Sequence, residues 1–122
     1  MPGIQSDHAS DGRLPTAISN MVVALVRQYT GRGPTKSRTY LDDELITVVL
    51  QGTLSRSERR LIADGKSDLV LRARRAFQGI MRDDLVAGVE ALTGRTVLAF
   101  LGSNSIEPDV NVKSFLLAPE AE

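Results

Sequence analysis

The chain has 122 residues, with 15 Lys and Arg, 15 Asp and Glu, one His, and no Cys or Trp, so its formal net charge is zero. This length fits one domain with a core of its own. The charge balance argues against a uniformly basic nucleic-acid-binding protein, and the lack of Cys excludes disulfides, thiolate metal sites and a cysteine nucleophile.

The first 30 residues divide into a polar tail and a helix. Residues 1–13 are poor in apolar side chains and rich in Ser, Asp and Gly, which predicts a disordered tail. A helix is predicted to begin near Pro15, because proline suits a first helical turn. Its apolar residues recur at helical spacing: Ile18, Val22, Leu25, Val26 and Tyr29. Gly31, Gly33 and Pro34 are predicted to end this helix.

Two extended segments follow. Residues 37–41 and 45–51 contain β-branched and aliphatic residues, and the acidic triplet 42–44 between them predicts a hairpin turn. This triplet is the densest carboxylate cluster in the chain. Consecutive turn residues point in different directions, so we expect a solvated turn there and no metal site.

A capping box predicts where the next helix begins. Ser55 and Glu58 have the S-x-x-E spacing, in which each side chain satisfies the backbone N–H of the other residue. A short helix over 56–63 is expected, then a longer one over 67–92. Apolar residues at helical spacing form the predicted buried face of the longer helix: Leu69, Ala73, Phe77, Ile80, Met81, Leu85, Val89 and Leu92.

The last third of the chain returns to strand character. A strand is predicted over 96–101, a loop over 102–109 and a strand over 110–117, while residues 119–122 are expected to be frayed. The fold class is therefore α+β, in the order α-β-β-α-α-β-β. We expect a single domain over residues 14–118, with two hairpins in one four-stranded antiparallel sheet and the helices packed on one face.

The sequence offers no complete catalytic set. Its only histidine, His8, lies in the predicted tail, where it cannot be held against a nucleophile and an acid. Accordingly, no catalytic residue, metal or cofactor is predicted, and the chain is expected not to be an enzyme. The longest apolar run, residues 21–26, is far shorter than the roughly 20 residues that a membrane span needs. The expected location is therefore the cytoplasm.

The neutral total hides an uneven distribution of charge. Residues 55–82 have eight basic side chains against three acidic ones, and residues 83–122 have two against seven. Arg72, Arg75 and Arg82 are predicted to share one stripe of the long helix, and Arg32 follows the first helix. These four arginines are the candidate contacts for a ligand or a partner. The alternative is a solvated face whose arginines pair with the acidic end of this chain or of a second copy.

The order of these motifs resembles the bacterial MpsC-like family, over about residues 15–118. The features that carry the resemblance, in chain order, are Asn20, the Gly31-Arg32-Gly33-Pro34 element, the acidic hairpin at 40–48, the segment 50–55 with Glu58 and Leu61, Arg72, Arg75, Phe77 and Arg82, and Leu92-Thr93-Gly94 before Val97. The family is named for a sodium-translocating, membrane-potential-generating system.

The resemblance implies a soluble, non-enzymatic accessory or regulatory protein. It would work with a cation or inorganic-carbon transport system through protein–protein contacts, and meet the membrane only through such a partner. A homodimer or higher homo-oligomer is expected, since the basic and acidic blocks can pair between subunits. Nucleic acid is not an expected partner. The alternative function is a sensor of small anionic ligands that uses the arginine stripe.

Overall fold

The computed structural model describes residues 12–120, and it contains the predicted elements in the predicted order. The elements are α2 (Arg13–Thr30), β1 (Lys36–Asp42), β2 (Leu45–Gln51), α3 (Arg56–Ala63), α4 (Ser67–Thr93), β3 (Val97–Ser105) and β4 (Val110–Leu117). Most of the predicted tail, including His8, lies outside the described residues, and Arg13 already belongs to α2. Pro119 and Glu120 follow β4 without regular structure.

The four strands form one antiparallel sheet in the order β1-β2-β4-β3. Each hairpin contributes an edge strand and an inner strand, and the two hairpins join where β2 pairs with β4. The α+β class and the sheet of two hairpins are therefore confirmed. The register sets which side chains face the helices, because alternate residues of a strand point to opposite faces.

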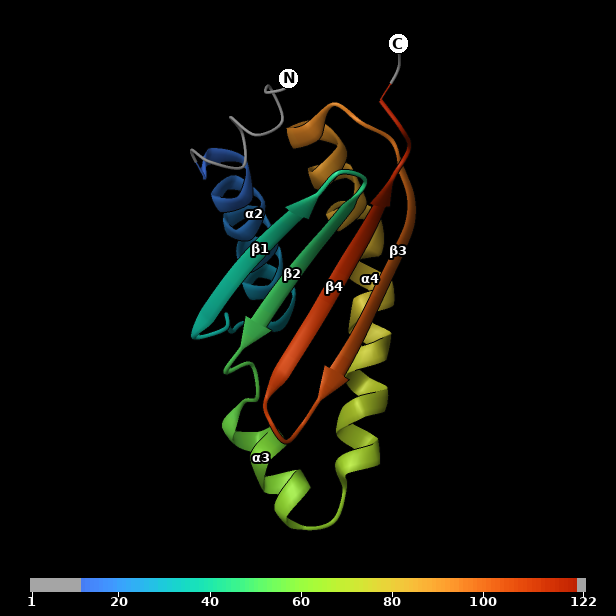
Figure 1. Ribbon diagram of the computed structural model, residues 1–122. Coiled ribbons are helices and arrows are strands. Elements are labelled where there is room, and N and C mark those ends of the chain that lie inside the picture. The colour runs from blue at the N-terminus through green and yellow to red at the C-terminus, as the bar shows by residue number, and fades with distance from the viewer. Residues whose placement is uncertain (1–11, 121–122) are drawn as a thin grey trace.

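The helices pack on one face of the sheet. Figure 1 shows α2 and α4 side by side behind the strands, and α3 beyond the end of β2. The core lies between these layers, and its central members are fully buried: Ile18 and Val22 from α2, Val48 from β2, Leu85 from α4 and Phe115 from β4. The opposite face of the sheet is not covered by any element of the described chain.

One predicted loop is in fact a strand. Residues 102–105 were expected to leave the sheet because Gly, Ser and Asn are frequent in turns, yet β3 continues to Ser105. Each of these residues lies opposite a residue of β4, ending with Ser105 opposite Val110. Backbone pairing with an inner strand therefore overrides the weak strand propensity of polar residues at this edge.

Five residues of the predicted buried face of α4 are in fact exposed: Leu69, Ala73, Phe77, Ile80 and Leu92. Met81, Leu85 and Val89 are buried as predicted. For the exposed residues in the first half of α4, the reason is the length of the neighbouring helix. With 18 residues against 27, α2 is about 13 Å shorter than α4, so the first turns of α4 extend past its end. No helix within residues 12–120 is long and apolar enough to cross a bilayer.

Candidate functional site

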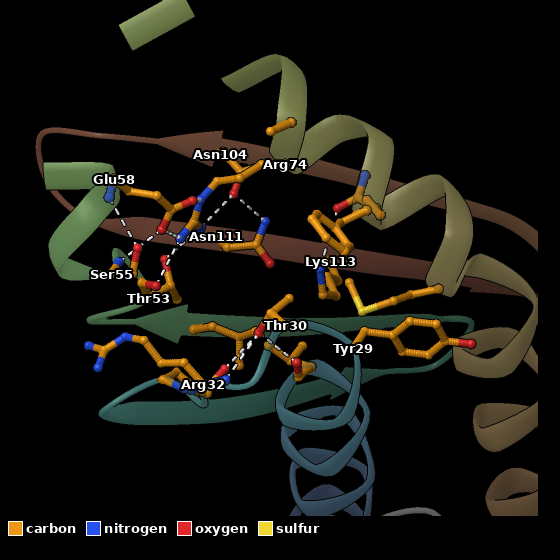
Figure 2. A pocket seen from close by; sticks show the side chains of 17 residues that line it. Tyr29, Thr30, Arg32, Thr53, Ser55, Glu58, Arg74, Asn104, Asn111 and Lys113 are labelled. Carbon is orange, nitrogen blue, oxygen red and sulfur yellow. Dashed lines mark hydrogen bonds and ion pairs between the residues drawn. The ribbon is translucent and has the colours of Figure 1, made fainter. Parts of the chain in front are cut away.

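A cavity of about 270 Å³ lies where α2 ends and leaves α4 uncovered. Its walls come from the end of α2, the first half of α4, the helix-facing sides of β2 and β4, and the segment before α3 (Figure 2). Apolar side chains form much of the lining: Val26, Pro34, Leu50, Ala73, Phe77 and Met81. The remaining lining is polar and comes from every wall: Tyr29, Thr30 and Arg32 at the end of α2, Thr53, Ser55 and Glu58 around the start of α3, Arg74 and Gln78 on α4, and Asn104, Asn111 and Lys113 on the sheet.

Lys113 of β4 is the most unusual residue in this cavity. It shares the helix-facing side of its strand with Phe115, and only 3% of its surface is exposed. Its ammonium group makes one long hydrogen bond, to Gln78 Oε1 at 3.4 Å, and no ion pair to Lys113 is found among residues 12–120. Burial lowers the pKa of Lys113 to about 8, and the positive charge of Arg74 contributes to this shift. A buried cation without a counter-ion favours binding of an anion beside it.

Asn111 lies two residues before Lys113 and points into the same cavity (Figure 2). Its Nδ2 donates to the backbone oxygen of Ser103 at 3.0 Å and to Asn104 Oδ1 at 2.9 Å. Its Oδ1 is buried and has no partner in the structure. Since a backbone oxygen can only accept, the bond to Ser103 fixes the orientation of the amide. An acceptor without a hydrogen-bond partner and a cation without an ion-pair partner therefore lie two residues apart on the helix-facing side of β4.

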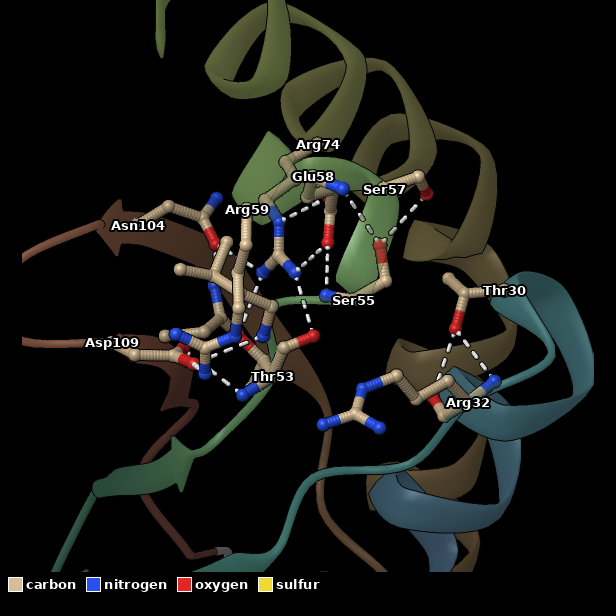
Figure 3. A network of polar contacts seen from close by, with 12 residues as sticks. Thr30, Arg32, Thr53, Ser55, Ser57, Glu58, Arg59, Arg74, Asn104 and Asp109 are labelled. Atoms are coloured by element: carbon tan, nitrogen blue, oxygen red, sulfur yellow. Dashed lines mark hydrogen bonds and ion pairs between the residues drawn. The ribbon is translucent and has the colours of Figure 1, made fainter. Parts of the chain in front are cut away.

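Arg74 closes the cavity on the side of α3 and is already fully engaged (Figure 3). Its guanidinium donates to both carboxylate oxygens of Glu58, at 2.9 and 2.8 Å, and to the hydroxyl and backbone oxygens of Thr53, both at 2.8 Å. A fifth, longer bond of 3.4 Å reaches Asn104. Arg74 therefore holds α3, α4 and β3 together, and its charge is matched by Glu58.

The capping box at the start of α3 supplies the other side of this network. Ser55 Oγ accepts from the backbone N–H of Glu58 at 3.1 Å, and the Glu58 carboxylate accepts from the backbone N–H of Ser55 at 2.8 Å. Burial alone would raise the pKa of Glu58, but the hydrogen bonds from Arg74 and Ser55 and the charge of Arg74 lower it. Glu58 is therefore held as a carboxylate.

Asp109, in the turn between β3 and β4, anchors the segment that precedes α3. It accepts from the backbone N–H groups of Thr53 and Leu54 at 3.0 Å and from the Thr53 hydroxyl at 2.8 Å. It also pairs with Arg59 at 3.3 Å. Burial would raise the pKa of Asp109, but these backbone and hydroxyl bonds and the charge of Arg74 lower it. These bonds fix the segment before α3, which lines the cavity, to the turn at the end of the sheet.

The Gly31-Arg32-Gly33-Pro34 element forms the rim at the end of α2. Gly31 ends the helix in the left-handed conformation, with φ of 80°, and donates to the Arg27 backbone oxygen. Arg32 is exposed and reaches across the rim to the backbone oxygen of Gly52 at 3.2 Å. Gly33 leaves room for the guanidinium of Arg27. Both Arg32 and Pro34 line the cavity.

The three arginines of the predicted stripe are not part of this site. Arg72, Arg75 and Arg82 are all exposed and none lines the cavity. Arg72 lies 3.9 Å from Asp68 and Arg82 lies 3.6 Å from Asp83, both on α4 itself. The structure therefore brings together Arg32, Ser55 and Glu58 around the cavity and leaves the stripe on the surface.

Lys113, Asn111 and the network of Arg74 were not predicted from the sequence. A signal for the first two was present, because two-residue alternation places Asn111 and Lys113 on the same side of the strand as Phe115 and Leu117. A lysine in register with core residues is a candidate for a buried charge. No comparable signal marks Arg74, whose partners are distant in the sequence.

Comparison with known proteins identifies one family. A family model described as "Na+-translocating membrane potential-generating system (MpsC)" matches residues 10–118. No curated protein and no solved structure matches the chain.

Proposed function

The chain belongs to the MpsC family, and we propose that it is a non-enzymatic accessory protein that regulates a sodium-translocating membrane system by binding a small anion in the Lys113 cavity. One observation carries this proposal. Lys113 is 3% exposed, faces a cavity and has no ion-pair partner among the described residues. The link to a membrane system is supported by the description of the family, and regulation through contact with a partner protein is part of the proposal.

The energetics of Lys113 favour a bound anion. Removing an ammonium group from water is costly unless an opposite charge replaces the lost hydration. Glu58 cannot supply that charge, because both its carboxylate oxygens are occupied by Arg74. An anion in the cavity would neutralise Lys113, and this stabilisation appears as binding free energy.

The alternative use of the arginine stripe has less support. Arg72, Arg75 and Arg82 are solvated, so a small anion would gain little from them after screening by salt. They remain available for contacts with a partner protein. The anion-binding role therefore moves from the stripe to the cavity, with Arg32 at its rim.

Binding measurements with a Lys113→Met variant test the anion site. We expect acetate, bicarbonate or phosphate to raise the melting temperature of the wild type and not that of the variant. Methionine replaces the apolar stem of lysine with an unbranched apolar side chain one atom shorter, and it has no charge. Lys66→Met is the matched control, because Lys66 is exposed and does not line the cavity. An equal response in the Lys113 variant would overturn the proposal.

Recovery of a partner tests the regulatory role. The tagged full chain is incubated with detergent-extracted membranes of the source cells, with and without the anion that binds. We expect a membrane transport protein to be retained in amounts that change with the anion for the wild type and do not change for Lys113→Met. Retention that is identical in all four samples would contradict the regulatory role.

The uncovered sheet face is the surface that best suits the predicted homo-oligomer. Leu45 and Leu116 lie opposite each other at the β2–β4 junction, 41% and 40% exposed, and Tyr40 and Leu101 extend this apolar area over β1 and β3. Four strands of about seven residues span roughly 450 Å². Two such faces packed together approach the lower limit of specific interfaces. We propose a second copy of this chain as the occupant, because one face can then serve both subunits.

A further inference from the structure

We infer that the ligand of the Lys113 cavity is a small 2-hydroxy carboxylate with an apolar tail. This inference rests on the proposed function, in which the cavity binds an anion, and it adds the chemical class. Three properties of the lining define that class: a positive charge without an ion-pair partner, an acceptor without a hydrogen-bond partner on the same strand face, and apolar side chains in the same cavity.

The net charge of the residues that line the cavity favours a ligand with one negative charge. Its buried ionised residues are Lys113, Arg74 and Glu58, and the last two neutralise each other through paired bonds of 2.9 and 2.8 Å. Arg32 is solvated at the rim. A single ammonium group therefore remains deep in the cavity. A carboxylate satisfies it with one unit of charge, whereas a phosphate dianion would bury a second charge without a partner.

The unpaired oxygen of Asn111 calls for a hydrogen-bond donor on the same ligand. Asn111 is 4% exposed, and its Oδ1 has no partner. Residues two apart on a strand lie on the same face with their Cα atoms about 7 Å apart, so one small molecule can reach both Asn111 and Lys113. A hydroxyl group on the carbon next to the carboxylate provides this donor. An ammonium group is less suitable, because Lys113 and Arg74 would both repel it.

The size and walls of the cavity call for an apolar tail. Leu50, Phe77 and Met81 contribute apolar surface to the lining. A volume of about 270 Å³ corresponds to roughly nine water molecules at ~30 Å³ each, and so to a ligand of about ten non-hydrogen atoms. Bicarbonate has the charge and the hydroxyl but fills a small part of this space. A branched or cyclic tail of three to five carbons would exclude water from the apolar walls.

Isothermal titration calorimetry on the full chain tests the class with four probes. These are 2-hydroxy-4-methylpentanoate, 4-methylpentanoate without the hydroxyl, lactate without the tail, and inorganic phosphate. We expect the first to bind about tenfold more tightly than the second, as one added hydrogen bond to a buried acceptor provides, and more tightly than the other two.

Variants locate each contact. Lys113→Met should abolish binding of the first two probes. Asn111→Ala should make them bind equally, because the acceptor for the hydroxyl is gone, and its fold is checked by circular dichroism. Lys66→Met should bind like the wild type.

The outcomes separate this inference from the proposed function. If anions bind in a Lys113-dependent manner but without preference for the hydroxyl, or if phosphate binds most tightly, the ligand class is wrong and the anion site stands. If no probe binds, or if binding persists in Lys113→Met, both are wrong. Loss of the hydroxyl preference in Asn111→Ala, with the preference intact in the wild type, supports the inference.

Discussion

Arg74 on α4 and Glu58 on α3 form a bidentate ion pair at 2.8 and 2.9 Å, with only 17% and 24% of their side chains exposed. The same carboxylate completes the capping box of α3. One contact therefore joins the two helices, satisfies a helix end and forms a wall of the cavity. Since removal of either partner leaves a half-buried charge behind, the pair should be sensitive to single substitutions.

Arg74→Met should lower the free energy of unfolding by about 2–4 kcal/mol, because it removes five hydrogen bonds and leaves Glu58 without its partner. Urea denaturation followed by circular dichroism measures this loss. Arg72→Met is the matched control on the same helix. Its ion pair with Asp68 is 3.9 Å long and solvated, so its effect should stay within about 0.5 kcal/mol. Equal effects of the two variants would refute the structural role of Arg74.

Stability should fall in acid as the network protonates. The pKa values of Glu58 and Asp109 are lowered in the folded chain, so the unfolded chain binds more protons as the pH drops. Their stabilisation is complete above the ordinary carboxyl pKa values near 4.5 and 3.8, and it is lost as the pH falls through the lower folded values.

Asp109→Asn should therefore be less stable than the wild type at pH 6, by about 1–2 kcal/mol, and the difference should shrink below pH 4. Guanidinium denaturation at pH 6, 4 and 3 measures it. A difference that stays constant over this range would show that the charge of Asp109 contributes nothing. The exposed Asp83→Asn is the control, with an effect within about 0.5 kcal/mol.

Oligomerisation should depend on the uncovered sheet face. Leu116→Lys places a charge beside Leu45 on that face, where a second copy would desolvate it. If the wild type is a dimer by light scattering at micromolar concentration, we expect this variant to be a monomer. Ile80→Lys, which changes an exposed apolar residue on α4, should remain a dimer. A wild-type monomer would contradict the homo-oligomer, and a Leu116→Lys dimer would move the interface elsewhere.

Local patterns predicted the elements of this fold well, because the signals are short in range. The spacing of Ser55 and Glu58 locates the start of α3, and the alternation in residues 110–117 marks β4. The order of these elements then restricts the sheet to a few arrangements. The burial of residues on α4 was less predictable, because it depends on the neighbouring helix. Phe77 lies on a helical stripe that would be buried if α2 were longer, and the sequence of α4 does not indicate where α2 ends.

The candidate site was less predictable for the same reason. Arginines on one helix face can be recognised from their spacing in the sequence, and Arg72 and Arg75 were predicted as candidate contacts for that reason. Whether such a stripe can bind a small ligand depends on the exposure of its side chains, which the spacing does not give. Lys113 is a single charge in an apolar strand, and its importance comes from the cavity that α2, α4 and β2 leave around it. The absence of a counter-ion can be seen only when all of these elements are placed.

Lys113 should make the stability of the chain rise at alkaline pH. Its pKa is about 8 in the folded chain and about 10.5 when unfolded, so between these values the unfolded state binds more protons and folding becomes more favourable as the pH increases. Below pH 8 the cost of burying the ammonium group is fully present, on the order of 3 kcal/mol. Lys113→Met removes this cost, so the variant should be more stable than the wild type at pH 7.

The stability difference between Lys113→Met and the wild type should shrink steadily from pH 8 to pH 10.5, and chemical denaturation across that range measures it. Comparison with the variant cancels the titration of other groups in this range, including Tyr29, whose pKa is raised chiefly by its hydrogen bond to Asp84. Lys66→Met should show no such slope. A difference that is independent of pH would mean that Lys113 is not a buried cation. Binding of a carboxylate should reduce this rise of wild-type stability with pH, because the carboxylate stabilises the ammonium form of Lys113. The affinity for the carboxylate should therefore fall as the pH rises above 8.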